Sequence, residues 1–526
     1  MLTFSSAIPY RTARLWFAGL FGLIILVAIL SYVQQYFRPQ SIVALAPDYK
    51  LKCASYAPYH RPGQSPFIEN FVASRSQIDE DLRFLSSKFA CVRTYSVNQG
   101  LDQVPELARK YGMKMYLGIW IGREAKKNQK EIERGIELAK ANADVIQGVI
   151  VGNEVLLRRE QTEAGLAAYI DQVKKQVDLP VTYADVWEFW LKHPALASSV
   201  DFVTVHILPF WEDDPQPIEK SIEHVSKVID KVKQTFNKPI LIGETGWPST
   251  GRQRETAVPS LVNEARYIRE FVHLAEAQDL NYNIIEAIDQ PWKRRSEGTV
   301  GGYWGIFDSH LKPKFSLSEP VINNGHNVMH FVGGLAGALV MLILGMSWHR
   351  VSGGIKPSRE LLLMANGASF GTLAWMQWQH ALFAYRNLGE WLVLGGMSLI
   401  SLLLGIGATL SAASLNDQLR PFLSYLVWLR RIVLFGAAVT GILFVCDPRY
   451  RDFPSLLYLP AAIGLLSCVI AGNRLLRFNR HEKILGFLMF VSLFGIAYRE
   501  GLRNEEAIAW LGVTIMLLAS FMQSRR

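Results

Sequence analysis

Two glutamates at the ends of apolar runs are the residues best suited to chemistry. Glu154 ends the run VIVGNE, residues 149–154, and Glu244 lies in ILIGETGW, residues 240–247. A carboxylate in an apolar context is costly unless a partner or a reaction makes use of it. Two opposed carboxylates can cleave a glycosidic bond, one as proton donor and the other as nucleophile. The alternative is a structural salt bridge, with Arg93 as a candidate partner that would also keep a nucleophile ionised.

The elements that would position these glutamates form an alternating pattern. Eight apolar, β-branched runs recur, and the segments between them carry helical periodicity. This pattern predicts an α/β fold, a (β/α)8 TIM barrel, in which Glu154 and Glu244 end the fourth and seventh strands and face each other across the mouth. A doubly wound open sheet is the alternative, but no G-x-G-x-x-G follows the first run. The runs begin at residues 52, 91, 114, 146, 180, 201, 239 and 281.

Polar and aromatic residues gather where the predicted strands end, which is the catalytic face of such a barrel. The tryptophans as a group predict a carbohydrate cleft, although each one could instead pack between strand and helix. Asp289 and Lys293 would bind sugar hydroxyls or pair with each other. The apolar context of Glu154 predicts that this carboxyl group is kept protonated as a proton donor. The candidate substrate-binding residues are Arg93, Tyr95, Trp120, Asn153, Asp185, Trp187, His206, Trp211, Trp247, Asp289, Trp292 and Lys293.

Long apolar stretches on both sides of the predicted barrel indicate a membrane protein. One stretch covers residues 15–33, and it reads as a retained anchor because no small-residue cleavage site follows it. Small residues at G-x-x-x-G spacing, Gly333 with Gly337 and Gly367 with Gly371, predict close helix packing. Seven further stretches lie at 328–347, 361–384, 391–413, 429–446, 455–473, 484–498 and 506–523.

Basic residues indicate the orientation of these eight predicted spans. With a cytoplasmic N-terminus, fourteen Lys and Arg residues fall on the cytoplasmic side and five in the opposite short loops. The prediction is a multi-pass protein of a bacterial inner membrane, with both termini cytoplasmic and the barrel periplasmic. The expected order is a cytoplasmic N-terminus (1–14), an anchor (15–33), the catalytic domain (34–322) and a seven-helix domain (323–526).

Charge and cysteines add two expectations. The formal net charge of +9 lies largely in the predicted cytoplasmic loops, which favours contact with the lipid bilayer and not with nucleic acid. Cys53 and Cys91 lie in the exported block, and two buried, unpaired thiols are favoured over a disulfide. No cysteine or histidine spacing indicates a metal site, and no cofactor is expected.

The segments VGNEV, residues 151–155, and IGETGWPS, residues 242–249, resemble the two signatures of glycoside hydrolase family 17. The resemblance covers about half of the chain and implies a retaining enzyme acting on β-1,3-glucan, with Glu154 as acid/base and Glu244 as nucleophile. It also implies that Asn153 binds the sugar 2-hydroxyl and that Arg93 and Tyr95 support the nucleophile. Plant members commonly carry Tyr at the end of strand six, where this chain has His206.

A barrel followed by seven spans resembles the bacterial membrane-bound members described as β-(1,6)-glucan synthases or transglycosylases. The expected function is therefore a transglycosylase that elongates, branches or cyclises periplasmic glucan, with a glucan synthase or exporter as a further candidate partner. An endo-β-1,3-glucanase with the same residues is the first alternative. A non-catalytic glucan sensor or exporter is the alternative from another class.

Overall fold

The computed structural model describes residues 10–323, 328–349, 356–413, 420–472 and 478–521. It forms two compact units, one of residues Pro39–Val321 and one of the residues on either side of that segment. The first nine residues of the predicted cytoplasmic N-terminus lie outside the described residues. So do five of the arginines that indicated the orientation, namely Arg350, Arg474, Arg477, Arg525 and Arg526.

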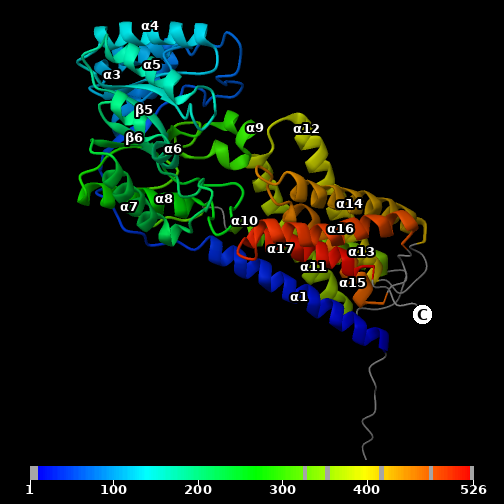
Figure 1. The fold of residues 1–526 in the computed structure, drawn as a ribbon. Helices are drawn as coiled ribbons and strands as arrows, with labels where there is room; N and C mark the ends of the chain where they lie inside the picture. Colours follow the sequence, from blue (N-terminus) through cyan, green and yellow to red (C-terminus); the bar gives the residue numbers. More distant parts are fainter. Residues whose placement is uncertain (1–9, 324–327, 350–355, 414–419, 473–477, 522–526) are drawn as a thin grey trace, which may run out of the picture. The chain divides into compact units, whose positions relative to one another are not determined.

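The Pro39–Val321 unit contains a closed barrel of eight parallel strands in sequential order, which confirms the predicted (β/α)8 fold (Figure 1). The strands are short, and most of their residues are buried because helices cover the outside and side chains fill the inside. They are β1 (Leu51–Ser55), β2 (Phe89–Arg93), β3 (Lys114–Ile119), β4 (Ile146–Asn153), β5 (Val181–Val186), β6 (Val203–His206), β7 (Ile240–Thr245) and β8 (Asn281–Ile284).

Helices follow the strands and place their apolar faces on the barrel. In α7, Val225, Ile229 and Val232 recur at helical spacing and are fully buried. Ser74, before α2, accepts a hydrogen bond from a backbone N–H of the first turn and so fixes the start of that helix. The longer helices are α2 (Arg75–Leu85), α3 (Val104–Lys110), α4 (Ala125–Ala141), α5 (Glu163–Lys174), α6 (Trp187–Lys192), α7 (Ile218–Thr235) and α8 (Leu261–Ala277).

The last predicted strand run is divided into two elements. Strand β8 closes the barrel against β1, but after Ile285 the chain forms β9 (Glu286–Ile288), which pairs in parallel with β10 (Gly305–Phe307) in a separate two-stranded sheet. Short helical segments lie between β9 and β10, including α9 (Arg294–Glu297). The segment from Glu286 to Phe307 therefore adds a small layer beyond the eighth strand.

Cys53 and Cys91 form a disulfide, so the favoured expectation of two unpaired thiols was wrong. The two cysteines occupy the same register position on the neighbouring parallel strands β1 and β2. Two residues further along the same strands are Ser55, which accepts a hydrogen bond from Tyr95, and Arg93, which is a predicted site residue. The disulfide therefore links the two strands directly below that site.

We expect removal of this disulfide to destabilise the barrel. Cys53→Ala combined with Cys91→Ala should lower the free energy of unfolding by about 2–4 kcal/mol, because the bond restricts the unfolded chain. Thermal unfolding of the oxidised full-length protein, followed by tryptophan fluorescence, would measure this. Cys446→Ala is the matched control, since Cys446 is a free, exposed cysteine. Equal midpoints for the double variant and the control would contradict the expectation.

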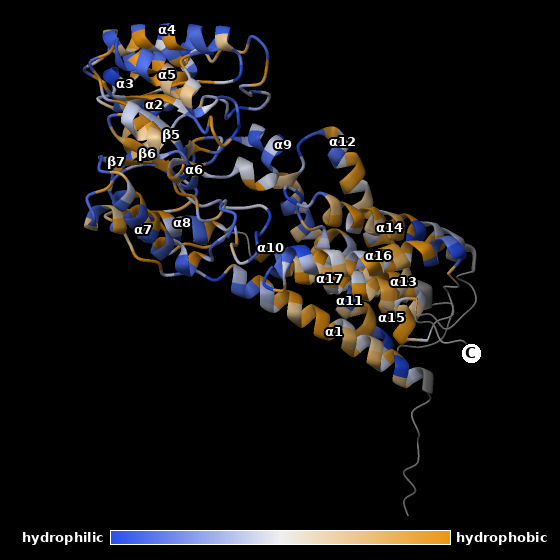
Figure 2. Ribbon diagram, viewed as in Figure 1, coloured by the Kyte–Doolittle hydropathy of each residue, from blue (hydrophilic) through white to orange (hydrophobic). Residues whose placement is uncertain are grey.

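The second unit consists of helices at each of the eight predicted apolar stretches. Figure 2 shows that these helices are predominantly hydrophobic, whereas hydrophilic residues cover much of the barrel helices. The helices are α1 (Tyr10–Tyr36), α10 (Val328–His349), α11 (Pro357–Ala384), α12 (Leu388–Glu390) continuing through a π-helical turn (Trp391–Gly395) into α13 (Gly396–Ala413), α14 (Arg420–Cys446), α15 (Ser455–Ile470), α16 (Arg480–Glu500) and α17 (Glu505–Ala519).

Five helices among the described residues are long and apolar enough to cross a membrane. Helix α15 is apolar but shorter, and α11 and α17 also fall outside this group. A span needs about 20 predominantly apolar residues, whereas α15 and α17 have 16 and 15 residues. The number of spans therefore stays a prediction. The five segments are Thr12–Tyr36, Val328–Ser347, Leu388–Ala413, Ser424–Cys446 and Arg480–Glu500.

Glycines allow close helix packing in this unit, as the G-x-x-x-G spacing predicted. A Cβ added to Gly337 would lie 2.1 Å from the carbonyl oxygen of Gly367, so α10 and α11 touch through their backbones. Helix α1 packs against the same partner, because a Cβ at Gly22 would lie 2.4 Å from the side-chain oxygen of Asn366. Helix α11 is thus in contact with both α1 and α10.

Candidate active site

Glu154 lies just beyond β4, where the chain turns sharply. Gly152 has a φ of 87°, Glu154 has a φ of 53°, and the register with β5 shifts between Ile150 and Asn153. A left-handed conformation in a residue other than glycine costs roughly 1–3 kcal/mol and occurs often at functional sites. The Glu154 backbone N–H donates to the carbonyl of Ala184 at 2.7 Å, which holds the turn in place. Its side chain remains partly exposed, with 24% accessibility.

Glu244 lies near the end of β7 and is held by two donors from the β2 side of the barrel. Arg93 Nη1 lies 3.2 Å from Glu244 Oε1, and the Tyr95 hydroxyl donates to the same oxygen at 2.9 Å. Arg93 is fully buried and also donates to the carbonyl of Gly243 at 2.8 Å and to Asn153 Oδ1. The guanidinium therefore connects the amide beside Glu154 to the carboxylate of Glu244. The expected Arg93–Glu244 contact is present.

His206, at the end of β6, lies between the two glutamates. Its Nδ1 is 3.0 Å from Glu154 Oε1, and its Nε2 is 3.6 Å from Glu244 Oε1. The His206 side chain has no exposed surface, and its Nε2 makes no hydrogen bond within the described part of the chain. The expectation that His206 binds sugar does not fit this burial. Its partners are the carboxylates.

The pKa of Glu154 differs in direction from the expectation. Burial raises the pKa of this carboxyl group, but the hydrogen bond with His206 and the positive charges of His206, Arg158 and Arg93 outweigh burial and lower the pKa. The apolar run around Glu154 predicted a carboxyl group kept protonated, and that was wrong. The sequence analysis placed His206 at the same end of the barrel, but as a sugar ligand and not as a hydrogen-bond partner of Glu154.

Asp185, on β5, supports the turn that carries Glu154. It accepts hydrogen bonds from the Tyr183 hydroxyl and from the backbone N–H of Leu157 at 3.4 Å. The backbone N–H of Leu156 donates to the same tyrosine at 3.0 Å. Burial raises the pKa of Asp185 to about 6. The predicted sugar ligand Asp185 is therefore placed beneath the segment after Glu154, not at its surface.

The predicted aromatic residues fall into an accessible and a buried group. Trp120 is 38% exposed, and the guanidinium of Arg158 lies 4.3 Å from the centre of its ring. Trp292 is partly buried, donates to Gln290 at 2.8 Å and meets the exposed ring of Phe67 edge to face. These two rings are available to a ligand.

The other predicted tryptophans, Trp187, Trp211 and Trp247, are buried to different degrees. Trp187 is partly buried and donates to Glu212 at 3.2 Å, and Trp211 is partly buried and stacks on Trp304. Trp247 is fully buried and donates to the carbonyl of Val258 at 3.0 Å. Trp247 is therefore a core residue, and its assignment as a sugar ligand was wrong because its ring is buried against Phe210 and Tyr267.

Asp289 and Lys293 do not pair with each other. Lys293 forms an ion pair with Glu286, whereas Asp289 pairs with Lys314 at 2.9 Å. Burial raises the pKa of Glu286 to about 7 and that of Asp289 to about 6. The sequence interpretation missed Glu286 and Lys314. The alternation in EAID, residues 286–289, could have indicated Glu286. Lys314 lies in an irregular segment with no periodic signal.

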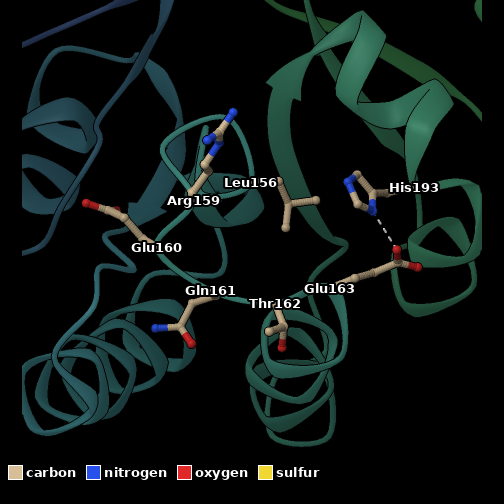
Figure 3. Close-up of a pocket in the computed structure, with 7 residues that line it drawn as sticks. All are labelled: Leu156, Arg159, Glu160, Gln161, Thr162, Glu163 and His193. Carbon is tan, nitrogen blue, oxygen red and sulfur yellow. Dashed lines mark hydrogen bonds and ion pairs between the residues drawn. The ribbon is translucent and has the colours of Figure 1, made fainter.

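A separate cavity of about 440 Å³ lies beside the segment that connects β4 with α5 (Figure 3). It contains none of the predicted site residues, so the chemistry suggested by the two glutamates lies elsewhere. His193 and Glu163 lie side by side at the edge of this cavity and pair at 2.6 Å. Its lining is Leu156, Arg159, Glu160, Gln161, Thr162, Glu163 and His193.

Glu154, His206 and Glu244 form one compact group. One oxygen or nitrogen atom from each lies within 4.8 Å of the others, a spacing that would also be compatible with a metal ion. A cation is already present, however, because the Arg93 guanidinium contacts Glu244, and His206 Nδ1 is bonded to Glu154. The arrangement is better suited to moving protons and to attacking an electrophilic carbon.

Comparisons with known proteins agree with this chemistry. The model of the BtgE/BtgC glycoside hydrolase domain matches residues 53–305. A glucan 1,3-beta-glucosidase of Candida albicans is 26% identical over 266 residues, which are 46% of this chain and 86% of that protein. The probable beta-glucosidase btgE of Aspergillus flavus is 28% identical over 262 residues, 48% of this chain and 42% of that protein. The chain is therefore an enzyme of the glycosidase and transglycosylase class.

More narrowly, residues 53–305, just under half of the chain, are similar to the BtgE/BtgC glycoside hydrolase domain and to family 17. Among solved structures, a family 17 beta-1,3-glucanosyltransferase from Rhizomucor miehei is 25% identical, with a TM-score of 0.45. The match covers 51% of this chain and 98% of that chain.

Proposed function

We propose that this protein is a retaining β-1,3-glucan transglycosylase in which Glu244 is the nucleophile and Glu154 the acid/base. The separation of the two carboxylates supports the retaining mechanism, on which the proposal rests. In retaining enzymes the carboxyl groups are about 5–5.5 Å apart, whereas inverting enzymes need about 6.5–9.5 Å to admit a water molecule. Here oxygens of Glu154 and Glu244 lie within 4.8 Å of each other, which favours direct attack by Glu244.

The reaction would proceed in two steps. Glu244 Oε attacks the anomeric carbon as Glu154 protonates the leaving oxygen, which gives a glycosyl ester on Glu244. A hydroxyl group of a second glucan chain then attacks the ester while Glu154 accepts its proton. Arg93 donates a hydrogen bond to Asn153 Oδ1, so the amide nitrogen of Asn153 is the atom that would donate to the sugar 2-hydroxyl. Trp120 and Trp292 would offer faces for the two glucan segments.

The substrate proposal is supported by the relatives, which are named as enzymes of glucan 1,3-β linkages. Hydrolysis of the same glucan is the second candidate, because the names of the Candida albicans and Saccharomyces cerevisiae relatives describe glucosidases. We further propose that the apolar helices anchor the enzyme in a bacterial inner membrane, with the barrel periplasmic, and that it elongates, branches or cyclises glucan there.

Product length separates transfer from hydrolysis. Detergent-solubilised full-length protein, incubated with β-1,3-gluco-oligosaccharides of one length, should form products longer than the substrate, visible by chromatography and mass spectrometry. Shorter products alone would favour the hydrolase. No products beyond those of a Glu244→Gln control would contradict the proposed function altogether.

A further inference from the structure

The imidazole of His206 contacts both carboxylates of the proposed reaction and has no exposed surface. Nδ1 is within hydrogen-bond distance of Glu154, and Nε2 points toward Glu244 without a hydrogen-bond partner in the described residues. A buried imidazole nitrogen without a partner is costly unless it serves a purpose. Gly243 makes room for this ring, since an added Cβ there would lie 3.0 Å from Cδ2 and 3.2 Å from Nε2 of His206.

We propose that His206 is a positioning residue that stores the catalytic proton for Glu154. In the first step, the His206 imidazolium gives its Nδ1 proton to Glu154 Oε1 as Glu154 protonates the glycosidic oxygen, and the bond between that oxygen and the anomeric carbon breaks. The His206 ring is left neutral, with its remaining proton on Nε2, which faces Glu244. In the second step, the acceptor hydroxyl gives its proton to Glu154, which returns one to His206 Nδ1 as the new glycosidic bond forms. No proton is gained or lost over the cycle.

This inference rests on the proposed function, and it resolves a difficulty in it. Glu154 must act as an acid in the first step and as a base in the second. Its lowered pKa suits the base but leaves a carboxylate without a proton to donate. A store hydrogen-bonded at 3.0 Å supplies that proton without requiring a permanently protonated carboxyl group.

The charges around the ring suit an imidazole that gains and loses a proton. Three acidic groups face it, from the end of β4, from β5 and from β7, and they would stabilise the imidazolium. Two arginines also act electrostatically on Glu154, and one of them contacts Glu244. The acidic groups are Glu154, Asp185 and Glu244, and the arginines are Arg93 and Arg158.

The dependence of kcat/KM on the leaving group tests the proton store in the full-length enzyme. His206→Gln keeps an amide that can bond to Glu154 but cannot carry a proton. We expect kcat/KM to fall about 10²-fold for a phenyl β-laminaribioside and little for the dinitrophenyl compound, whose leaving group needs no proton. For the phenyl compound, the alkaline limb of the pH profile should move to lower pH, because only a carboxyl group is left to hold the proton. The matched control His193→Gln, which removes another histidine paired with a glutamate, should behave like the wild type.

Equal losses with both substrates, or a raised KM with an unchanged pH profile, would overturn the proposal in favour of a structural or sugar-binding role. If His206→Gln does not fold, His206→Ala supplemented with imidazole replaces it, and rescue should favour the phenyl substrate. A readout without substrate is nitrogen NMR of histidine-labelled protein, in which the His206 signals should show protons on both ring nitrogens. A neutral His206 ring in this experiment, in either tautomer, would overturn the proton store. A wild type that is inactive on glucans would count against the proposed function alone.

Discussion

Glu244→Gln is expected to lower transglycosylation and hydrolysis of β-1,3-glucan by roughly 10⁴-fold or more. Removal of a covalent nucleophile in other enzymes costs up to about 10⁶-fold. The amide keeps the shape of the side chain, and Arg93 Nη1 and the Tyr95 hydroxyl, which contact Oε1 at 3.2 and 2.9 Å, can still reach its oxygen. The loss would therefore report the missing nucleophile and not a collapsed site. Initial rates on laminari-oligosaccharides measure the effect.

A small external nucleophile distinguishes the roles of the two carboxylates. In Glu244→Gly, azide should occupy the space left by the side chain and attack the anomeric carbon from the same side. It should restore turnover of an activated aryl laminaribioside, with an α-glycosyl azide as the product. In Glu154→Gly, azide should instead intercept the ester on Glu244 and give the β-azide. Glu133→Gln, on the exposed face of α4, is the control and should leave rates unchanged. The β-azide from the Glu244 variant would reverse our assignment of the two residues.

Arg93→Met should reduce both activity and stability. The guanidinium is fully buried and bonds to Gly243, Glu244 and Asn153, so its removal leaves the buried Glu244 carboxylate without its arginine partner. Breaking a buried ion pair by removing one partner costs about 3–5 kcal/mol. We expect a lower thermal midpoint together with a fall in kcat of about 10²-fold or more, because Glu244 is no longer held in position.

Arg109→Met is the matched control for Arg93. Arg109 pairs with Asp144 at 2.7 Å, but the two side chains are 41% and 60% exposed, and such surface pairs contribute about 0–1 kcal/mol. Unfolding followed by fluorescence and rates on the same oligosaccharide should both remain near wild type. Equal destabilisation by the two substitutions would show that the Arg93 contacts do not hold the site together.

The barrel and the two glutamates were predictable because their signals are local. Each strand is a short apolar run, the runs recur at the length of a βα unit, and the glutamates end two of those runs. Arg93 and Tyr95 were also found, since they lie at the end of β2. The same reasoning could not tell which of two neighbouring side chains points into the core and which points to the barrel mouth. Trp247 and Glu244 end one run, yet one side chain faces the core and the other the mouth.

Contacts between distant segments were not predictable in the same way. The pairing of Lys293 with Glu286 and of Asp289 with Lys314 depends on how the chain folds back after β8, and no periodicity reports that. The bridging position of His206 depends on the register between β6 and β7, which shifts at this residue. The two cysteines were predicted to stay unpaired because the sequence alone does not give the alignment of β1 and β2. In the structure the disulfide follows from that register, which places Cys53 opposite Cys91.

The contact between α1 and α11 has a consequence for the order in which the protein is made. Helix α1 ends at Tyr36 and its partner begins at Pro357, so roughly 300 residues are synthesised between the two. At about 5–20 residues per second, some 15–60 s pass after the synthesis of α1 before α11 is available to pack against Gly22. With α1 as the membrane anchor, it must persist in the bilayer as a single span during this time. Its 25-residue apolar stretch is long enough to do so without a partner.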